Sequence, residues 1–502
     1  MTDAWKIIAA ALLAIACAAA NAASPEPDLV LTGTLDGRDH QRYRTVPFDV
    51  PAGTERITVQ FDYDGREQKT TVDLGLLGPG GFADPHGFRG WSGGNKRSFT
   101  VSSTDATPSY LPGKIEPGRW SLLLGIPNIR AASVAKYSAR VWFAKAGAPV
   151  WEPQSLVPPL RTGDAWYRGD LHLHDAHSDG SCRSQNDVKV PCPVFLTAQA
   201  AVARGLDFIA ITDHNTTSHA NAMRELQPYF DRLLMVPGRE ITTFSGHANL
   251  FGTVAPLDFR VTEGRTWNDV LRDARALHGV VSINHPVRPS DERCMGCGWT
   301  PSPAADVDLL QAVEVVNGMD ADTPWSGVPF WHAQLDAGHR LTAIGGSDNH
   351  DAGKSLSDPG GGAVGQPTTV VRAAALSMPA ILDGLRSGNV FVDVQGSRDR
   401  TMSMRGRVGK RTAVMGSELV VRRGETATFE IAVARAKGAR VVLWLDGRQA
   451  PGLLADPAVD SDEDTLRLRW NGDGRTHWLR ADVRGPDGTL WMIGNPIYIS
   501  GG

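Results

Sequence analysis

The fourteen residues YRGDLHLHDAHSDG, which begin at Tyr167, contain three histidines and three aspartates. Both side chains are ligands of divalent metal ions in proteins. His172 and His174 are two residues apart, so on an extended strand both imidazoles point to the same side. Two imidazoles on one side of a strand end can bind one metal ion, although surface strands also show this spacing. The stretch therefore predicts a metal site only if other ligands join it.

Further candidate ligands recur at predicted strand ends between residues 166 and 395. Three helical stretches lead through a glycine (Gly205, Gly279, Gly338) into an apolar strand that ends in histidine or aspartate: 194–205 before LDFIAITDHN, 267–279 before VVSINHP, and 330–338 before RLTAIGGSDNH. The glycines suit helix C-caps, and the apolar strands suit burial on both faces. Such alternation predicts an α/β barrel or a doubly wound sheet, whose active site lies at the C-terminal strand ends.

The regions on either side have the alternating pattern of antiparallel sheets. RITVQFDY (56–63) and TFEIAVAR (428–435) place apolar side chains at every second position. We expect sandwich-like β domains over 27–150 and 405–502. The proline-rich stretch GAPVWEPQSLVPPL (147–160) is predicted to be a linker.

Residues 1–22 are typical of a secretory signal peptide, because a lysine precedes an apolar run that ends in the small residues Ala20-Asn21-Ala22. We therefore expect a periplasmic or secreted protein. A lipid anchor through Cys17 is the alternative, which is disfavoured because Ala14 stands where a leucine is expected. No other segment approaches the length of a stable membrane span.

Four cysteines follow the signal, and an even number in an exported protein favours disulfide bonds. The preferred pairing joins Cys182 to Cys192 and Cys294 to Cys297, while a structural zinc site made of all four is the rival. The net charge of −4 over 502 residues gives no reason to expect a nucleic-acid partner.

The ordered motifs HSDG, TDHN, GRE, GHAN, NHP and SDNH resemble those of the PHP (polymerase and histidinol phosphatase) superfamily of metal-dependent hydrolases. Within it, the CehA/McbA-type branch is the most similar, and the stretches at 365–393 and 495–499 also resemble that branch. The resemblance implies a distorted (β/α)7 barrel over 166–395 that holds two or three divalent metal ions. The flanking β regions resemble the branch only weakly.

Carried over motif by motif, the resemblance also implies which residues bind each metal ion. The implied ligands are His172, His174, Glu240 and Asp348 for a first ion, His247 and His285 with a bridging Glu240 for a second, and Asp179, His214 and His350 for a third. No cysteine is among them, which suits zinc, manganese or iron. Zinc or manganese is favoured, because ferrous iron is harder to keep reduced in an exported enzyme.

Two divalent ions that share a carboxylate lower the pKa of a shared water from about 16 towards about 7, which supplies hydroxide at neutral pH. We therefore expect an exported metal-dependent hydrolase of small-molecule esters, most of all a phosphoesterase, in which Asp348 also orients the water or takes its proton. A carboxyl-ester or carbamate hydrolase with the same metal site is one alternative. A non-catalytic binding module is another.

Three residues outside the implied ligand set are further candidates. His219 follows His214 by five residues and is predicted to protonate a leaving group. Arg288 follows NHP and is predicted to bind an anionic substrate. Asp213 is expected to orient a neighbouring histidine. A serine hydrolase is disfavoured, because GGSDN (345–349) lacks the second glycine of a GxSxG motif and its aspartate is already an implied metal ligand.

Overall fold

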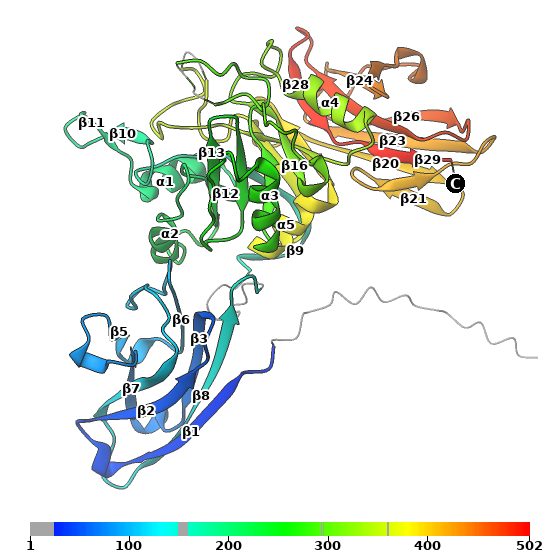
Figure 1. Ribbon diagram of the computed structural model, residues 1–502. Coiled ribbons are helices and arrows are strands. Elements are labelled where there is room, and N and C mark those ends of the chain that lie inside the picture. Colours follow the sequence, from blue (N-terminus) through cyan, green and yellow to red (C-terminus); the bar gives the residue numbers. More distant parts are fainter. Residues whose placement is uncertain (1–24, 149–158, 293, 295, 359–360, 502) are drawn as a thin grey trace, which may run out of the picture.

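A computed structural model describes residues 25–148, 159–292, 294, 296–358 and 361–501 of the chain (Figure 1). The predicted signal peptide (1–22), Cys17 and most of the predicted linker lie outside these residues, so export and anchoring stay predictions. In the part that is described, no helix combines the length and apolarity needed to cross a membrane.

The N-terminal region consists of two four-stranded antiparallel sheets that face each other across one apolar core. The strands of the first sheet, in spatial order, are β1 (Leu29–Asp36), β8 (Val134–Lys145), β3 (Thr54–Tyr63) and β6 (Ser98–Ser102). Those of the second sheet are β2 (Arg42–Val50), β7 (Gly118–Asn128), β4 (Thr71–Leu77) and β5 (Phe88–Trp91). The alternating apolar side chains of β3 all point into the core, as their period of two requires.

The central region is built on a sheet of parallel and antiparallel strands. In spatial order its strands are β17 (Thr342–Gly346), β16 (Ala312–Asn317), β15 (Val280–Ile283), β14 (Gly246–Phe251), β13 (Leu234–Thr243), β12 (Phe208–Ile211), β9 (Arg161–Asp170), β18 (Thr368–Leu376) and β19 (Val390–Asp393). Neighbours β9, β12 and β13 run parallel, as do β15, β16 and β17, whereas β14, β18 and β19 pair antiparallel. Parallel strands in the two groups therefore end at one edge.

In the described part of the chain, five α-helices pack against this sheet, and a short hairpin projects from it (Figure 1). They are α1 (Val194–Arg204), α2 (Ala220–Leu226), α3 (Trp267–Ala276), α4 (Val328–Asp336) and α5 (Met378–Ser387), and the hairpin consists of β10 (Ser181–Arg183) and β11 (Lys189–Pro191). Gly205 caps α1 as predicted. At the end of α3 the residue with positive φ is His278 rather than the predicted Gly279.

The strands of the central sheet do not form a closed ladder in the described residues, so the seven-stranded barrel stays a prediction. The two ends of the sheet nevertheless approach each other where the strands end. Leu173, which follows β9, forms an isolated parallel bridge with Asn349, which follows β17. The segment that carries His172 and His174 therefore lies beside the one that carries Asp348 and His350.

The C-terminal region adds a second sheet and also extends the central one. A four-stranded antiparallel sheet contains β21 (Arg411–Val414), β20 (Thr401–Val408), β23 (Thr426–Ala434) and β26 (Glu463–Asn471). The central sheet continues from β19 into β28 (Leu490–Gly494), β27 (His477–Arg484), β24 (Arg440–Leu445), β25 (Arg448–Gln449), β29 (Ile497–Ser500) and β22 (Glu418–Val420). The domain predicted at 405–502 therefore shares a sheet with the central region, which the sequence pattern does not indicate.

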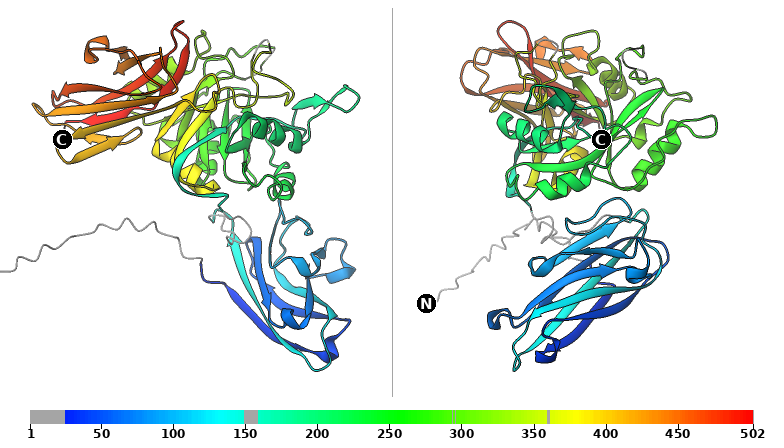
Figure 2. Two further views of the ribbon diagram at one scale, coloured as in Figure 1. Left: turned by 180° about the vertical axis from the view of Figure 1, so that it is seen from behind. Right: turned by 90° about the vertical axis from the view of Figure 1, so that its left-hand side faces the viewer.

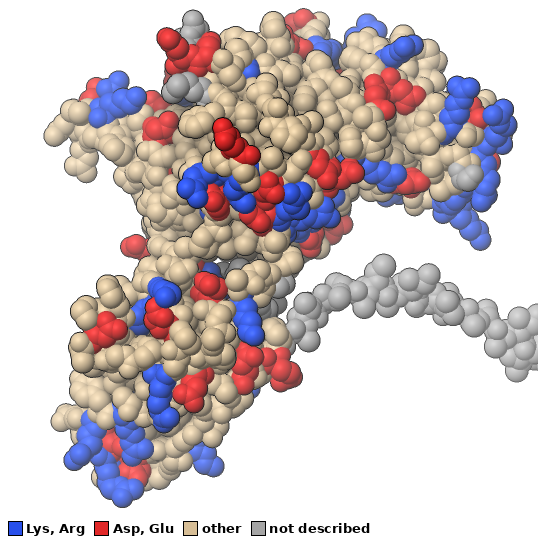
Figure 3. Space-filling view, viewed as in Figure 1, with Lys and Arg blue, Asp and Glu red and all other residues tan. Residues whose placement is uncertain are grey.

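The central region lies between the two β regions in all three views (Figures 1 and 2). Acidic and basic side chains are interspersed over it on the face seen in Figure 3. On helix α3 and the loop before it, for example, Arg265 forms an ion pair with Asp273, and Arg272 forms one with Asp269. The mixture gives this face no single sign of charge.

A buried carboxylate connects the N-terminal sandwich to the central region. Asp105 is fully buried and binds Arg56 of β3 and Arg224 of α2, with shortest nitrogen–oxygen distances of 2.5 and 2.6 Å. Burial alone would raise the pKa of Asp105, but the two guanidinium groups outweigh it and lower that pKa below its usual value. The ionised form therefore stabilises the folded state.

We predict that Asp105→Asn lowers the free energy of unfolding by about 3 kcal/mol at pH 7, because two guanidinium groups lose their buried partner. A depressed carboxyl pKa stabilises the fold above the usual pKa of about 3.9, and this contribution is lost progressively as the pH falls from there through the lower pKa of the folded state. Urea unfolding at pH 7 and pH 3 measures both effects, with the exposed Asp49→Asn as control. An equal deficit at the two pH values would contradict the assignment.

Candidate metal centre

Four side chains implied as ligands of the first metal ion meet at the edge where β9, β13 and β17 end. The Nε2 atoms of His172 and His174 both lie 3.5 Å from Oε2 of Glu240 and 3.3 Å from Oδ1 of Asp348. Both histidines and Glu240 are at most 1% exposed. Neither Nε2 makes a hydrogen bond within the described chain.

These distances fit a single divalent cation. In a tetrahedral site with metal–ligand bonds of about 2.1 Å, neighbouring ligand atoms are about 3.4 Å apart. Each of the four measured nitrogen–oxygen distances is 3.3 or 3.5 Å, so the atoms stand at the spacing of such a site. Buried polar atoms without partners are rare in proteins, and a bound cation would satisfy them. The residues present therefore fit a metal ion.

A second donor group lies beside the first and faces solvent more. Oδ1 of Asp179 is 3.6 Å from Nε2 of His214 and 3.3 Å from Nε2 of His350, and His174 lies in the same group. The Nδ1 atom of His350 bonds the carbonyl oxygen of Asp348 at 2.9 Å, which directs Nε2 towards Asp179. The structure thus brings together the side chains that the resemblance implies for the third ion.

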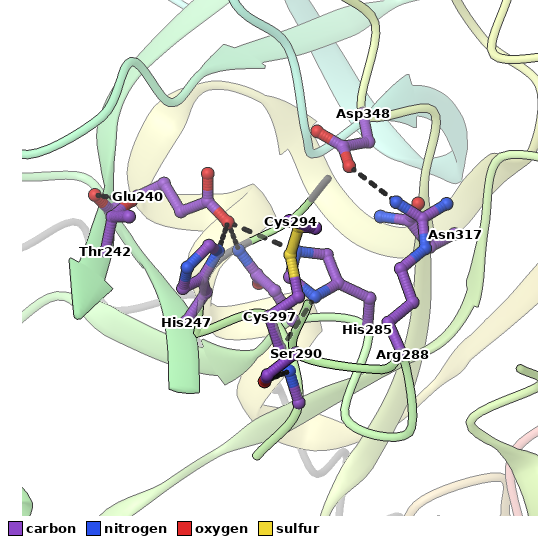
Figure 4. The surroundings of a disulfide bond; sticks show 12 residues. Glu240, Thr242, His247, His285, Arg288, Ser290, Cys294, Cys297, Asn317 and Asp348 are labelled. Carbon is purple, nitrogen blue, oxygen red and sulfur yellow. Dashed lines mark hydrogen bonds and ion pairs between the residues drawn. A yellow bond between two sulfur atoms is a disulfide. The ribbon is translucent and has the colours of Figure 1, made fainter. Parts of the chain in front are cut away.

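A third donor group surrounds the other oxygen of Glu240 (Figure 4). Its Oε1 lies 3.1 Å from Nδ1 of His247, 3.4 Å from Nε2 of His285 and 2.9 Å from Nδ2 of Asn284. Because Oε2 faces the first group, Glu240 has one oxygen in each and stands where a bridging carboxylate must stand. His247 comes from the antiparallel strand β14, which pairs with β13 so that Thr242 is opposite His247.

Glu314 was not among the predicted residues, and it orients two of these histidines. Glu314 lies within β16, is 2% exposed and bonds Nδ1 of His172 at 3.0 Å and the backbone N–H of His285 at 3.0 Å. Asn317 donates to the same carboxylate at 2.8 Å. A Cβ at Gly346 would lie 2.4 Å from that of His172 and 2.5 Å from Glu314, so only glycine fits there. A lone acid inside the apolar run AVEVV was the available signal, since a buried charge needs partners.

The electrostatics of the centre favour positive charge. Burial disfavours the charged imidazolium of His172, but Asp348, Glu314 and Glu240 outweigh it and raise the pKa of His172 well above its ordinary value. Burial likewise opposes ionisation of Glu240 and Asp348, yet the neighbouring histidines lower both pKa values well below the ordinary range. The negative charges that favour a proton here also favour a divalent cation.

Two of the candidate ligands have strained backbone. The φ angles are +26° at His285 and +53° at Asp348, which lie in the region that glycine prefers. Such a conformation costs about 1–3 kcal/mol per residue and persists where the surrounding contacts determine it. Here the contacts are those of Glu314 with the backbone of His285 and of the Leu173–Asn349 bridge beside Asp348. The folded chain holds both side chains at the centre despite this cost.

The three candidates outside the ligand set have different surroundings. Arg288 lies at the centre, where its guanidinium is 3.2 Å from Oδ2 of Asp348 and 3.0 Å from Oδ2 of Asp320. His219 is fully buried, and its Nδ1 lies 2.8 Å from Oδ2 of Asp213, so Asp213 stands beside a histidine that it could orient. Its role as an acid towards the leaving group stays a prediction.

The disulfide pairing agrees only in part with the prediction. Cys294 and Cys297 form a disulfide bond, whereas Cys182 and Cys192 are free and buried. In the β10–β11 hairpin, Cys182 stands opposite Val190 rather than Cys192. Burial first, and then the nearby Cys182, raise the pKa of Cys192 to about 12. The rival site with four cysteines is not found among the described donor groups, in which Cys297 is the one cysteine.

Comparison with known proteins adds little to this picture. No family model and no curated protein matches the chain. A solved structure of a xylanase 10C variant from Cellvibrio japonicus in complex with xylopentaose is similar at 9% identity and a TM-score of 0.15. The match covers 57% of this chain and 51% of that one, so the chain spans about half the length of the xylanase structure. A likeness this weak carries no argument about fold or activity.

We predict that Glu314→Gln lowers the affinity for zinc by about 10- to 100-fold, because the tautomer of His172 is no longer fixed by a carboxylate. Competition with a chromophoric chelator measures the affinity. The exposed Glu263→Gln serves as the matched control and should leave it unchanged. Equal affinities for the two variants would show that Glu314 does not orient a ligand.

Proposed function

We propose that the protein is a metal-dependent hydrolase of the PHP type that acts on ester bonds, with phosphate esters as its preferred substrates. The observation that carries the proposal is the set of 3.3 and 3.5 Å distances among His172, His174, Glu240 and Asp348. Every position that the resemblance implies as a ligand has a nitrogen or oxygen donor at one of three adjacent groups. Zinc or manganese suits such donors.

The arrangement of the three donor groups supports a phosphate ester. Divalent ions bound there supply Lewis acidity and a nucleophile from water at neutral pH. Glu240 and His174 each belong to two groups, which keeps the groups adjacent. The transition state of phosphoryl transfer spreads negative charge over three oxygens, so adjacent positive centres are complementary to it. Arg288 adds a further positive charge beside Asp348.

We predict that His172→Ala and Asp348→Asn each lower kcat/KM on bis(p-nitrophenyl) phosphate by at least about a thousandfold, which corresponds to roughly 4 kcal/mol of lost transition-state stabilisation. A chelator should abolish the activity of the unchanged protein, and added zinc or manganese should restore it. Release of p-nitrophenolate gives the rate. Bound metal is measured in parallel by elemental analysis.

The matched control is His339→Ala, which removes an imidazole that bonds Asp308 and precedes β17, whereas Asp348 follows that strand. It should keep the activity of the unchanged protein. Purified protein that neither contains nor binds divalent metal would overturn the proposal. Full activity in the presence of chelator would do the same.

A carboxyl-ester or carbamate hydrolase with the same donor groups is separated from a phosphoesterase by Arg288. We predict that Arg288→Met lowers kcat/KM on phosphate esters about 10- to 100-fold more than on naphthyl acetate, because a charge-assisted bond to a phosphate oxygen contributes about 1.5–3 kcal/mol. Parallel assays on both substrates measure the ratio. An equal loss on both, with naphthyl acetate or a naphthyl carbamate as the better substrate, would favour the alternative.

A further inference from the structure

The disulfide bond of Cys294 and Cys297 lies directly beside the donor group around His247 and His285 (Figure 4). Cys297 Sγ and one nitrogen of each imidazole all lie within 4.8 Å of one another. Cys297, His247 and His285 are 0, 4 and 3% exposed. Two imidazoles and one sulfur at this spacing can bind one metal ion. Of these three donors, only the sulfur is tied up in a covalent bond to another residue, the disulfide.

Each of the two histidines has a ring nitrogen available to bind a metal ion. Nδ1 of His285 donates to the carbonyl oxygen of Cys297 at 3.2 Å, which leaves Nε2 to face Glu240 at 3.4 Å. His247 bonds Glu240 through Nδ1, and its buried Nε2 has no partner among the described residues. One buried polar atom of this group, Nε2 of His247, therefore lacks a partner among the described residues, and a bound cation would satisfy it.

Contacts other than the disulfide hold the Cys297 backbone in place. A Cβ at Gly296 would lie 2.1 Å from the carbonyl oxygen of Thr243, so this glycine packs tightly against the turn between β13 and β14, and its φ is +81°. The N–H of Gly298 donates to Oγ of Ser290 at 3.0 Å, and that of Trp299 to the carbonyl of Pro286 at 2.9 Å. Opening the disulfide therefore leaves Sγ of Cys297 beside both imidazoles.

We propose that Cys297 becomes a ligand of the metal ion held by His247 and His285 when the Cys294–Cys297 disulfide is reduced. A dithiol reductant supplies two electrons and two protons, and it is itself oxidised to a disulfide. The two protein sulfurs become thiols, and Cys297 releases its proton to solvent as it binds the cation. The inference rests on the proposed metal centre and adds a redox-controlled ligand to it.

The change of ligand alters which metal the site prefers. In the oxidised protein the donors of this group are imidazole nitrogens and a carboxylate oxygen, which suit manganese as well as zinc. A thiolate is a soft donor that favours zinc over manganese. We therefore expect the reduced protein to bind zinc at least about tenfold more tightly, since even partners outside the ligand shell change metal affinity by that factor. The affinity for manganese changes less.

Two variants of the full chain form a matched pair for the test. Cys294→Ser and Cys297→Ser each remove the same disulfide and keep Cys182 and Cys192 as a common background. Only Cys294→Ser leaves a sulfur beside His247 and His285. Each metal-free protein is titrated with Co²⁺ and then with Zn²⁺ in competition with a chelator, and the near-ultraviolet spectrum reports thiolate-to-cobalt charge transfer.

We expect the charge-transfer band in Cys294→Ser and in the reduced unchanged protein, and its absence in Cys297→Ser and in the oxidised unchanged protein. Zinc should bind at least about tenfold more tightly to Cys294→Ser than to Cys297→Ser. Identical spectra and affinities for the two variants would overturn this inference, while cobalt binding without a thiolate band would leave the proposed metal centre intact. Oxidised protein that binds no cobalt at all would overturn both.

Discussion

The buried carboxylate of Glu240 is the interaction on which the centre depends. It is 1% exposed, and five imidazole nitrogens lie within 3.5 Å of its oxygens, from the segments after β9, β12 and β15 and from strand β14. These are the nitrogens of His172, His174, His214, His247 and His285. A buried charge is tolerated only when it is paired and hydrogen-bonded, so the strands must bring these partners to one edge. The topology of the central sheet meets this requirement by ending its parallel strands there.

The positions of the candidate ligands could be predicted from sequence because a local pattern determines them. An apolar strand that ends in histidine or aspartate indicates both a buried strand and the edge at which it ends. His214, His285 and Asp348 follow β12, β15 and β17 in this way. The resemblance then assigned each ligand to an ion, and the structure places the members of each set within a few ångströms of one another.

Other features could not be predicted because they depend on partners distant in sequence. The pairing of β19 with β28 joins the central and C-terminal regions, and no local period of Val390–Asp393 indicates which strand lies beside it. Glu314 was missed for a related reason, since its importance comes from His172, which is 142 residues away. Whether the central sheet closes into a barrel also depends on such contacts, and the ladder is open in the described residues.

The position of Glu314 explains why the centre is prearranged without relying on any one ligand. One carboxylate oxygen fixes the ring of His172, and the other accepts the backbone N–H of His285 at a residue with strained φ. The buried side chain of Glu314 therefore fixes both the ring of His172 and the backbone of His285, which belong to different donor groups. Since Asn317 donates to the same carboxylate, the cost of strain at His285 is offset by a connected network of protein hydrogen bonds. It follows that the metal-free chain should already hold these donor atoms near the positions described.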